Sequence, residues 1–357
     1  LSRQITFGGG FNCWGGRLRN FDKWDFNNDY SSWPINYEEL LKYKKKALDY
    51  FIIKNNKHLK KDENINFKNN KNFKFHYYNW SDVYWDTYYE KILNSKNIFL
   101  LLNRSLLKMN TDGKKITSII ISSNKLEKLK VKSKNYILAC GGIENSRILL
   151  YNNIKNNNTL IKNGKLIGKY WMEHPESLSA EILFFKRISK YRNYLDNSNS
   201  FNFSMRDNIK SKKKIPNIAA RTVISEFPKD NFKGKIRSLV CKSNGLKNFI
   251  EKRKGDLLCF SDLKVIMETI PDINNRIEIS KNEKDIFGIP KINLFWKQNQ
   301  IDYENHKNYL FEFAKFLINN DLGRLKIKSF ILDYETSSFY NTNYKNMSEW
   351  EKIYRVA

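Results

Sequence analysis

The chain has 357 residues, of which 41% are hydrophobic and 15% aromatic, and it carries a formal net charge of +27. This composition excludes a disordered chain, and the length suffices for one large core or two ordinary ones. Such a charge is common in proteins that bind nucleic acid or an anionic surface. Because the lysines are spread over the whole sequence together with many asparagines, we expect no dedicated nucleic-acid site.

Cysteine spacing and hydropathy exclude further classes of protein. Cys13, Cys140, Cys241 and Cys259 show no CxxC spacing, so neither a zinc site nor a disulfide framework is expected. No apolar run reaches the roughly 18 residues that span a bilayer. A reducing, cytoplasmic compartment is the default expectation. Because the chain begins at Leu1 and we interpret it as a fragment, a missing signal peptide does not argue against export.

A first glycine cluster occupies the stretch Phe7-Gly-Gly-Gly-Phe-Asn-Cys-Trp-Gly-Gly16. Five glycines in nine positions exclude a regular helix, and the aromatic residues around them argue against a flexible linker. A packed loop of this kind lets the backbone approach a flat ligand. Trp14 either covers one face of that ligand or belongs to the core, and the sequence favours neither interpretation.

Two helices are predicted after this loop. Asn36 and Glu39 have capping-box spacing at the start of a helix that runs to about Lys54. Residues 55–75 are rich in lysine and asparagine and are predicted to form a surface loop. An aromatic stretch then ends in a second, short helix before Asn94.

From residue 97 the pattern changes to strands. Strands are predicted over residues 97–102, 105–109, 116–122, 126–131 and 136–140. The three strands at 105–109, 116–122 and 126–131 are predicted to form an antiparallel β-meander, with a turn at 110–113 between the first two. The meander would lie between the two outer strands, which belong to a nucleotide-binding sheet. This arrangement indicates a flavin-binding fold rather than a plain nicotinamide-binding one.

A second glycine cluster follows the last of these strands. Gly141 and Gly142 lead directly into a helix predicted over residues 143–151, with Ile148 and Leu149 facing inward. The free N–H groups and the dipole at a helix start suit a phosphate or a ribose oxygen. A tight strand–helix turn that needs glycine only for close packing is the alternative.

The sequence after residue 175 predicts an antiparallel sheet and a helix. Strands are expected over residues 178–185, 257–269, 276–280 and 291–296, with a turn at 285–290. The helix is expected to begin with Asp302 as its cap and to stop near Gly323. Its inward face is predicted to consist of Leu310, Phe313, Ala314 and Leu317. We expect His306 on the surface of this helix.

Four segments, in this order, carry a resemblance to a known family. They are residues 7–16 with Asp25-Phe26 and Trp33-Pro34-Ile35, residues 138–150, residues 168–175, and residues 275–280 followed by Asp285, Gly288 and Pro290. Together they resemble the glucose–methanol–choline (GMC) oxidoreductases, and most of all the branch that acts on sugars and related alcohols. The four segments are spread over nearly the whole chain, and no single one of them identifies the family.

The resemblance implies FAD as the cofactor and names the residues that would contact it. They are Gly8, Gly9, Gly10, Asn12, Trp14 and Gly15 along the isoalloxazine and pyrophosphate, Leu106 against the adenine through its backbone, and Gly141 and Gly142 at the second turn. Phe11 departs from the family, which often has serine or threonine at this place. No metal ligand is expected.

The resemblance also implies that two family motifs lie outside this sequence. The GxGxxG turn that would hold the FAD pyrophosphate would precede Leu1, and the catalytic histidine would follow Ala357. We therefore assign no catalytic residue here and expect the fragment by itself to be inactive. None of the chain's histidines has an acid or nucleophile at a spacing that suggests a triad or a metal site.

The expected fold is α/β (α+β overall), with an incomplete FAD-binding Rossmann-like domain that contains the β-meander. This domain would comprise residues 1–34 and 96–175. A substrate domain built on an antiparallel sheet with helices would comprise residues 35–95 and 176–325. Residues 326–357 would return toward the FAD domain.

The expected function is that of an FAD-dependent oxidoreductase acting on a small-molecule sugar or other alcohol. Hydride would pass from the CH–OH carbon to flavin N5 and the proton to the histidine beyond the chain. Oxygen, a quinone and a cytochrome remain open as electron acceptors. A nicotinamide-dependent dehydrogenase would need a GxGxxG followed by an acid about 20 residues later, which this sequence lacks. A basic module that binds nucleic acid or a polyanionic glycan is the other alternative, and it would gather its lysines on one face.

Overall fold

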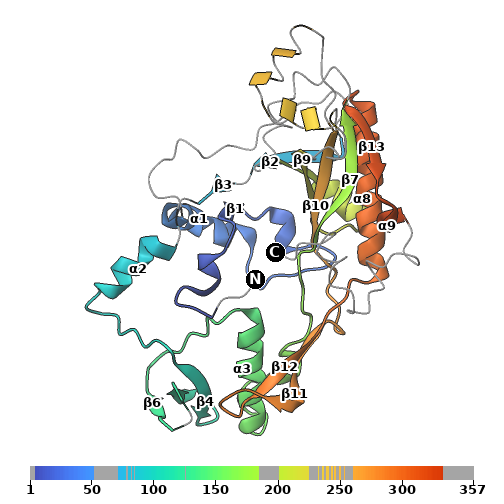
Figure 1. Ribbon diagram of the computed structural model, residues 1–357. Coiled ribbons are helices and arrows are strands. Elements are labelled where there is room, and N and C mark those ends of the chain that lie inside the picture. Colours follow the sequence, from blue (N-terminus) through green and yellow to red (C-terminus); the bar gives the residue numbers. More distant parts are fainter. Residues whose placement is uncertain are drawn as a thin grey trace. The chain divides into compact units, whose positions relative to one another are not determined.

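The structure is a computed structural model that divides into two compact units, each assembled from segments far apart in sequence (Figure 1). It describes residues 5–51, 71–124 except 78, 82 and 84, 126–184, 201–224 and 260–332, with isolated residues between 232 and 253. Unit 1 comprises Leu1–Gly15, Val83–Met172 and Pro271–Lys297. Unit 2 comprises Gly16–Asp82, Glu173–Ile270 and Gln298–Ala357.

Unit 1 contains the predicted β-meander. The strands β4 (Ser105–Thr111), β5 (Ile116–Ser122) and β6 (Leu129–Val131) pair antiparallel in this order. Asp112 closes the first turn by accepting hydrogen bonds from the backbone N–H groups of Lys114 and Lys115. The meander predicted from the sequence is confirmed.

A helix and a hairpin complete the regular structure around it. Helix α3 (Gly142–Lys155) contacts β4 and the antiparallel hairpin formed by β11 (Arg276–Lys284) and β12 (Pro290–Phe295). The remaining elements of unit 1 are the 3-10 helices η1 (Gly9–Asn12) and η4 (Gly164–Leu166) and the helix α2 (Trp85–Leu93). The short helix predicted before Asn94 is therefore present.

Two predicted strands of unit 1 are not strands. Residues 97–102 and 136–140 pair with no other strand among the described residues. Phe99 and Ile137 are 91% and 89% exposed, so the expectation of a buried strand before the second glycine pair is wrong. A strand needs a neighbour that receives its backbone hydrogen bonds, and the described part of the chain places none beside either segment.

Unit 2 contains a six-stranded antiparallel sheet in the order β13-β7-β10-β9-β8-β2. The strands are β2 (Phe73–Tyr77), β7 (Glu176–Phe184), β8 (Phe201–Met205), β9 (Ile218–Ile224), β10 (Phe260–Met267) and β13 (Gly323–Ile327). The predicted antiparallel sheet is confirmed. The predicted strands at 276–280 and 291–296, however, form the hairpin of unit 1 instead of joining this sheet.

The other elements of unit 2 whose bounds the structure describes are short, apart from two helices. They are β1 (Arg17–Leu18), which pairs with β3 (Asn79–Trp80), the 3-10 helix η2 (Lys23–Phe26), and the helices α1 (Tyr37–Phe51), α5 (Asp207–Lys213), α8 (Gln300–Asn319) and α9 (Ser329–Leu332). Asn36 caps α1 as predicted, since its side chain accepts the backbone N–H of Glu39 at 2.8 Å. Among the described helices, none combines the length and the apolar character needed to cross a bilayer.

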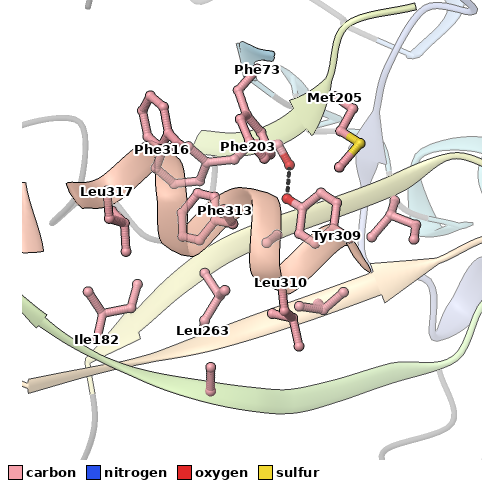
Figure 2. Close-up of a cluster of buried hydrophobic side chains, with 14 of the residues drawn as sticks. Phe73, Ile182, Phe203, Met205, Leu263, Tyr309, Leu310, Phe313, Phe316 and Leu317 are labelled. Atoms are coloured by element: carbon pink, nitrogen blue, oxygen red, sulfur yellow. Dashed lines mark hydrogen bonds between the residues drawn. The ribbon is translucent and has the colours of Figure 1, made fainter. Parts of the chain in front are cut away.

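Helix α8 packs on one face of the six-stranded sheet through aromatic side chains (Figure 2). Phe313 of α8 lies with its ring centroid 5.1 Å from Phe203 of β8 and 5.5 Å from Phe73 of β2. The predicted inward residues Leu310 and Leu317 are buried beside them. This face forms the main hydrophobic core of the unit.

Two expectations about α8 are corrected. Asn299, not Asp302, is the N-cap, and Asp302 is the third residue of a capping box in which each side chain accepts the other's backbone N–H. His306 is 2% exposed rather than on the surface, because it follows the buried face of the helix. Its Nε2 lies 2.8 Å from Oγ of Ser179 on β7.

The predicted domain boundaries stay a prediction, because compactness does not show which unit would bind a cofactor. The division between the units differs from those boundaries in several places, among them residues 83–95, which belong to unit 1, and residues 173–175, which belong to unit 2. Residues 16–34 belong to unit 2, and residues 271–297 pack with α3 in unit 1. Residues 333–357 of the predicted return segment, and 55–70 of the predicted surface loop, lie outside the described residues.

The buried hydroxyl of Tyr309 offers a test of the core of unit 2. It donates a 2.7 Å hydrogen bond to the carbonyl oxygen of Phe203 (Figure 2). Tyr309→Phe removes this buried hydrogen bond, so we expect the free energy of unfolding to fall by about 1 kcal/mol. Urea unfolding of the full-length protein, followed by tryptophan fluorescence, measures the change. Tyr43→Phe, at a side chain that is 61% exposed, is the control and should leave the midpoint unchanged.

Candidate functional site

All nine residues expected to contact a cofactor belong to unit 1. They lie in three places: Gly8, Gly9, Gly10, Asn12, Trp14 and Gly15 in the loop around η1, Leu106 on β4, and Gly141 and Gly142 at the start of α3. Within the unit, α3 contacts β4, and the N-terminal loop packs on α2. The three places are described one by one.

The N-terminal loop is held on α2 by aromatic contacts. The ring of Phe7 meets Trp85 edge to face at a centroid distance of 4.5 Å. Gly8 has a φ of +93°, and a Cβ at this position would lie 2.5 Å from the Trp85 ring. Gly8 therefore serves the packing of the loop, because both its backbone conformation and its contact require a residue without a side chain.

Asn12 and Trp14 stabilise the loop from within. The side-chain amide of Asn12 donates to Oγ1 of Thr6 at 3.1 Å and to the carbonyl oxygen of Phe7 at 3.0 Å. The ring of Trp14 stacks on Phe11 at a centroid distance of 5.1 Å and an interplanar angle of 19°. Phe11 thus supports Trp14 through its ring.

Four of the glycines have open space where a side chain would stand. No atom lies within 4 Å of a Cβ built on Gly9, Gly10, Gly15 or Gly141. A flat ligand could approach the backbone closely at these positions, so the residues present fit a dinucleotide. Gly142 differs, because its Cβ would lie 3.2 Å from the ring of Trp171.

The start of α3 presents backbone donors that have no acceptor within the helix itself. Gly141 is its N-cap with a φ of +83°. The side chain of Asn145 fixes the preceding segment, since its Oδ1 accepts the N–H of Cys140 at 3.0 Å and its Nδ2 donates to Leu138 at 3.3 Å. The positive end of the helix dipole at this place suits an anionic group.

Arg147 joins α3 to the turn of the β11–β12 hairpin. Its Nη2 lies 2.5 Å from Oδ2 of Asp285, and its Nε donates to the carbonyl oxygen of Pro290 at 2.8 Å. Asp285 also accepts the backbone N–H groups of Phe287 and Ile289 at 2.8 and 3.0 Å. Burial alone would raise the pKa of Asp285, but these hydrogen bonds and the guanidinium outweigh it and hold the pKa below its usual range.

Asn152 joins α3 to the meander. Its Oδ1 accepts the backbone N–H of Met109 on β4 at 2.7 Å, and its Nδ2 donates to the carbonyl oxygen of Ile148 at 2.9 Å. Asn156 adds a hydrogen bond to the carbonyl oxygen of Met109 at 3.3 Å. These side chains satisfy the outer edge of β4 in place of a neighbouring strand.

The sequence argument missed these anchors. Arg147 and Asp285 both lie in motifs that were recognised, but 138 positions separate them and no local pattern pairs them. Asn152 lies just beyond the helix predicted over residues 143–151. Nothing in the sequence indicated that its side chain would be buried. Only the folded chain brings these groups together.

The other reactive side chains of the described residues do not indicate a second catalytic or metal site. Cys13 and Cys140 are free and exposed. In the part of the chain that the structure describes, no three side chains of His, Cys, Asp or Glu gather as they would around a metal ion. Burial lowers the pKa of His306 to about 3, so this histidine is neutral at physiological pH.

Comparison with known proteins gives a sequence similarity over part of the chain and distant structural similarities. No family profile matches the chain. The chain is similar to the fructose dehydrogenase large subunit of Gluconobacter japonicus, with 26% identity over 199 residues that make up 54% of this chain and 34% of the relative. The similarity thus extends over about a third of that protein's length. A crystal structure of formate oxidase overlaps 65% of this chain and 46% of its own chain, at 13% identity and a TM-score of 0.35.

The packing role of Gly8 is open to a direct test. Gly8→Ala places a methyl group against the Trp85 ring at a positive φ, so we expect the loop to lose its packing and unit 1 to lose about 1–3 kcal/mol of stability. Urea unfolding of the full-length protein measures the loss. Gly245→Ala, at an open position without a positive φ, is the matched control. Equal midpoints for the two variants would contradict the packing role.

The Arg147 anchor predicts a loss that lysine cannot repair. A lysine has no planar fork to reach the Asp285 carboxylate and the carbonyl oxygens of Ile289 and Pro290 at once. We therefore expect Arg147→Lys to lower the free energy of unfolding by about 2 kcal/mol. The folded-state pKa of Asp285 lies below its unfolded value, so its stabilising effect is complete above pH ~4 and fades as the pH falls through the folded pKa.

Unfolding midpoints of the full-length protein at several pH values check both statements. The difference between Arg147→Lys and the wild type should shrink in acid. Lys291→Met removes the exposed ion pair of Lys291 with Glu283 and should change nothing measurable. A difference that is independent of pH would show that Asp285 is not the partner that matters.

Proposed function

We propose that this chain is part of an FAD-dependent oxidoreductase of the GMC type that oxidises a CH–OH group of a sugar or another small alcohol. The observation that carries the proposal is the similarity to the fructose dehydrogenase large subunit. The open backbone at both glycine clusters supports it, since a dinucleotide with a flat ring system needs such close approach. The ordered set of four sequence motifs points to the same family.

The proposal gives each glycine cluster a part in holding the cofactor. Gly9, Gly10 and Gly15 would let the loop backbone approach the flavin and the pyrophosphate, with Trp14 supported from behind by Phe11. The backbone of Leu106 would face the adenine. The start of α3 at Gly141 would direct its N–H groups toward the dinucleotide. When bound, FAD supplies the hydride acceptor that no side chain can provide.

The oxidation also needs a base for the hydroxyl proton. His306 does not suit this part, because it is buried against Ser179 and its lowered pKa of about 3 makes it a weak base. His58 and the side chain of His76 lie outside the described residues, and the acids beside His174 in the sequence, Glu173 and Glu176, do not have a spacing that suggests a catalytic triad. We therefore keep the expectation that the base is a histidine of the full-length protein beyond this chain, and that the fragment alone is inactive.

The test is the colour and flavin content of the full-length protein. We expect a yellow preparation with the visible absorbance of bound flavin. Gly10→Ala should fold like the wild type, because no protein atom lies near its Cβ, yet bind FAD about tenfold more weakly if the cofactor occupies that space. Gly245→Ala, which is equally open, should bind FAD normally. Fluorescence titration of apoprotein with FAD measures both.

A colourless full-length protein that stays colourless when FAD is added would overturn the proposal. That result would favour the alternative of a basic binding module, given the net charge of +27. Retention on heparin or on immobilised nucleic acid would then separate a polyanion-binding module from a protein that binds neither.

A further inference from the structure

Helix α2 supports the N-terminal glycine loop with three aromatic side chains, although the two segments lie far apart in sequence. The ring of Trp85 meets Phe7 edge to face at a centroid distance of 4.5 Å and Phe11 at 6.5 Å. The ring of Tyr88 lies 6.3 Å from Phe11, and that of Tyr89 lies 5.7 Å from Phe7. The loop and α2 both belong to unit 1, so these contacts lie within one compact body.

The backbone hydrogen bonds inside the loop are local. The N–H of Gly9 donates to the carbonyl oxygen of Thr6 at 2.9 Å, and the N–H of Cys13 donates to that of Gly10 at 3.1 Å. Bonds of this kind shape the turns of the loop but do not attach it to the rest of the unit. Ile5, where the described part of the loop begins, is 98% exposed and adds little packing. The ring contacts with α2, in contrast, do attach the loop.

The contacts continue from α2 to Trp14 through Phe11. Phe11 touches the rings of Trp85 and Tyr88, and it is also stacked on Trp14 at a centroid distance of 5.1 Å. A ring that is packed on several sides is held in one rotamer. The orientation of Trp14 therefore depends on α2, which holds the ring on which Trp14 is stacked.

We propose that Trp85 and Tyr88 are positioning residues for the flavin, which determine the affinity for FAD by holding the loop in its binding conformation before the cofactor arrives; this rests on the proposed function. Neither residue is among those expected to contact FAD. A loop that samples several conformations binds with an affinity reduced by the fraction of molecules in the competent one. A loop that is already ordered loses less conformational entropy on binding, so it binds more tightly.

The test measures the affinity of the full-length apoprotein for FAD by fluorescence titration. Trp85→Leu and Tyr88→Leu keep an apolar side chain but remove a ring, so we expect each to raise the Kd for FAD by about tenfold. Trp85→Phe and Tyr88→Phe keep a ring, and their Kd should stay within about threefold of the wild-type value. Leu93→Ala, at a position of the same helix that is 50% exposed, is the control and should leave the Kd unchanged.

Hydrogen exchange of the apoprotein shows whether the effect acts through the loop. The backbone N–H groups of Gly9 and Cys13 should exchange faster in both Leu variants than in the Phe variants, whereas those of α3 should keep their wild-type rates. Faster exchange throughout unit 1 would show that the rings only stabilise the fold, and it would overturn the positioning role.

Tyr88→Leu carries the test if Trp85→Leu does not fold. Gly8 packs directly on Trp85, whereas Tyr88 contacts the loop at Phe11, so the two variants disturb different contacts. A wild-type protein that binds no FAD overturns both the proposed function and this inference. A wild-type protein that binds FAD, with both Leu variants binding it equally well, overturns the positioning role alone.

Discussion

The place of α3 in unit 1 depends on polar side chains that bond to backbone atoms of distant segments. The fully buried residues of this helix are Asn152 and Asn153, not large apolar side chains. Asn152 bonds to β4, and Arg147 bonds to the turn between β11 and β12. Because hydrogen bonds are directional, these contacts fix the rotation of the helix as well as its position. The direction in which the first turn of α3 points is therefore set by Arg147 and Asn152, which lie about one and a half and nearly three turns after the start of the helix.

Unit 2 is stabilised in a different way, because one face of its sheet is packed with apolar side chains and the other carries charged ones. The face beneath α8 buries the aromatic side chains of Phe73, Phe203 and Phe313, and apolar burial of this kind is strong but not directional. The opposite face carries charged side chains in ion pairs, including that of Arg221 with Glu176. The alternation of side chains along each strand allows the second face to vary without disturbing the first.

The strength of electrostatic interactions in this protein depends on whether the charged groups are buried or exposed. The net charge of +27 belongs mostly to lysines dispersed along the chain, where water and salt screen them, so it says little about a specific partner. The ion pair of Arg221 with Glu176 involves only two charges, but both are buried, where screening is weak. The glycines show a similar contrast, because Gly8 is closed by the Trp85 ring whereas Gly10 borders open space.

The sequence by itself determined the elements that local patterns encode. The meander over β4–β6, the cap of α1 at Asn36 and the inward face of α8 all depend on residues within a few positions of one another. Tertiary structure alone decided that residues 136–140 pair with no strand in the described part of the chain, that His306 is buried, and that Arg147 meets Asp285. The physical reason is that spacing along the chain records which side chains share a face, whereas the partner of that face is a segment elsewhere whose position only the folded chain fixes.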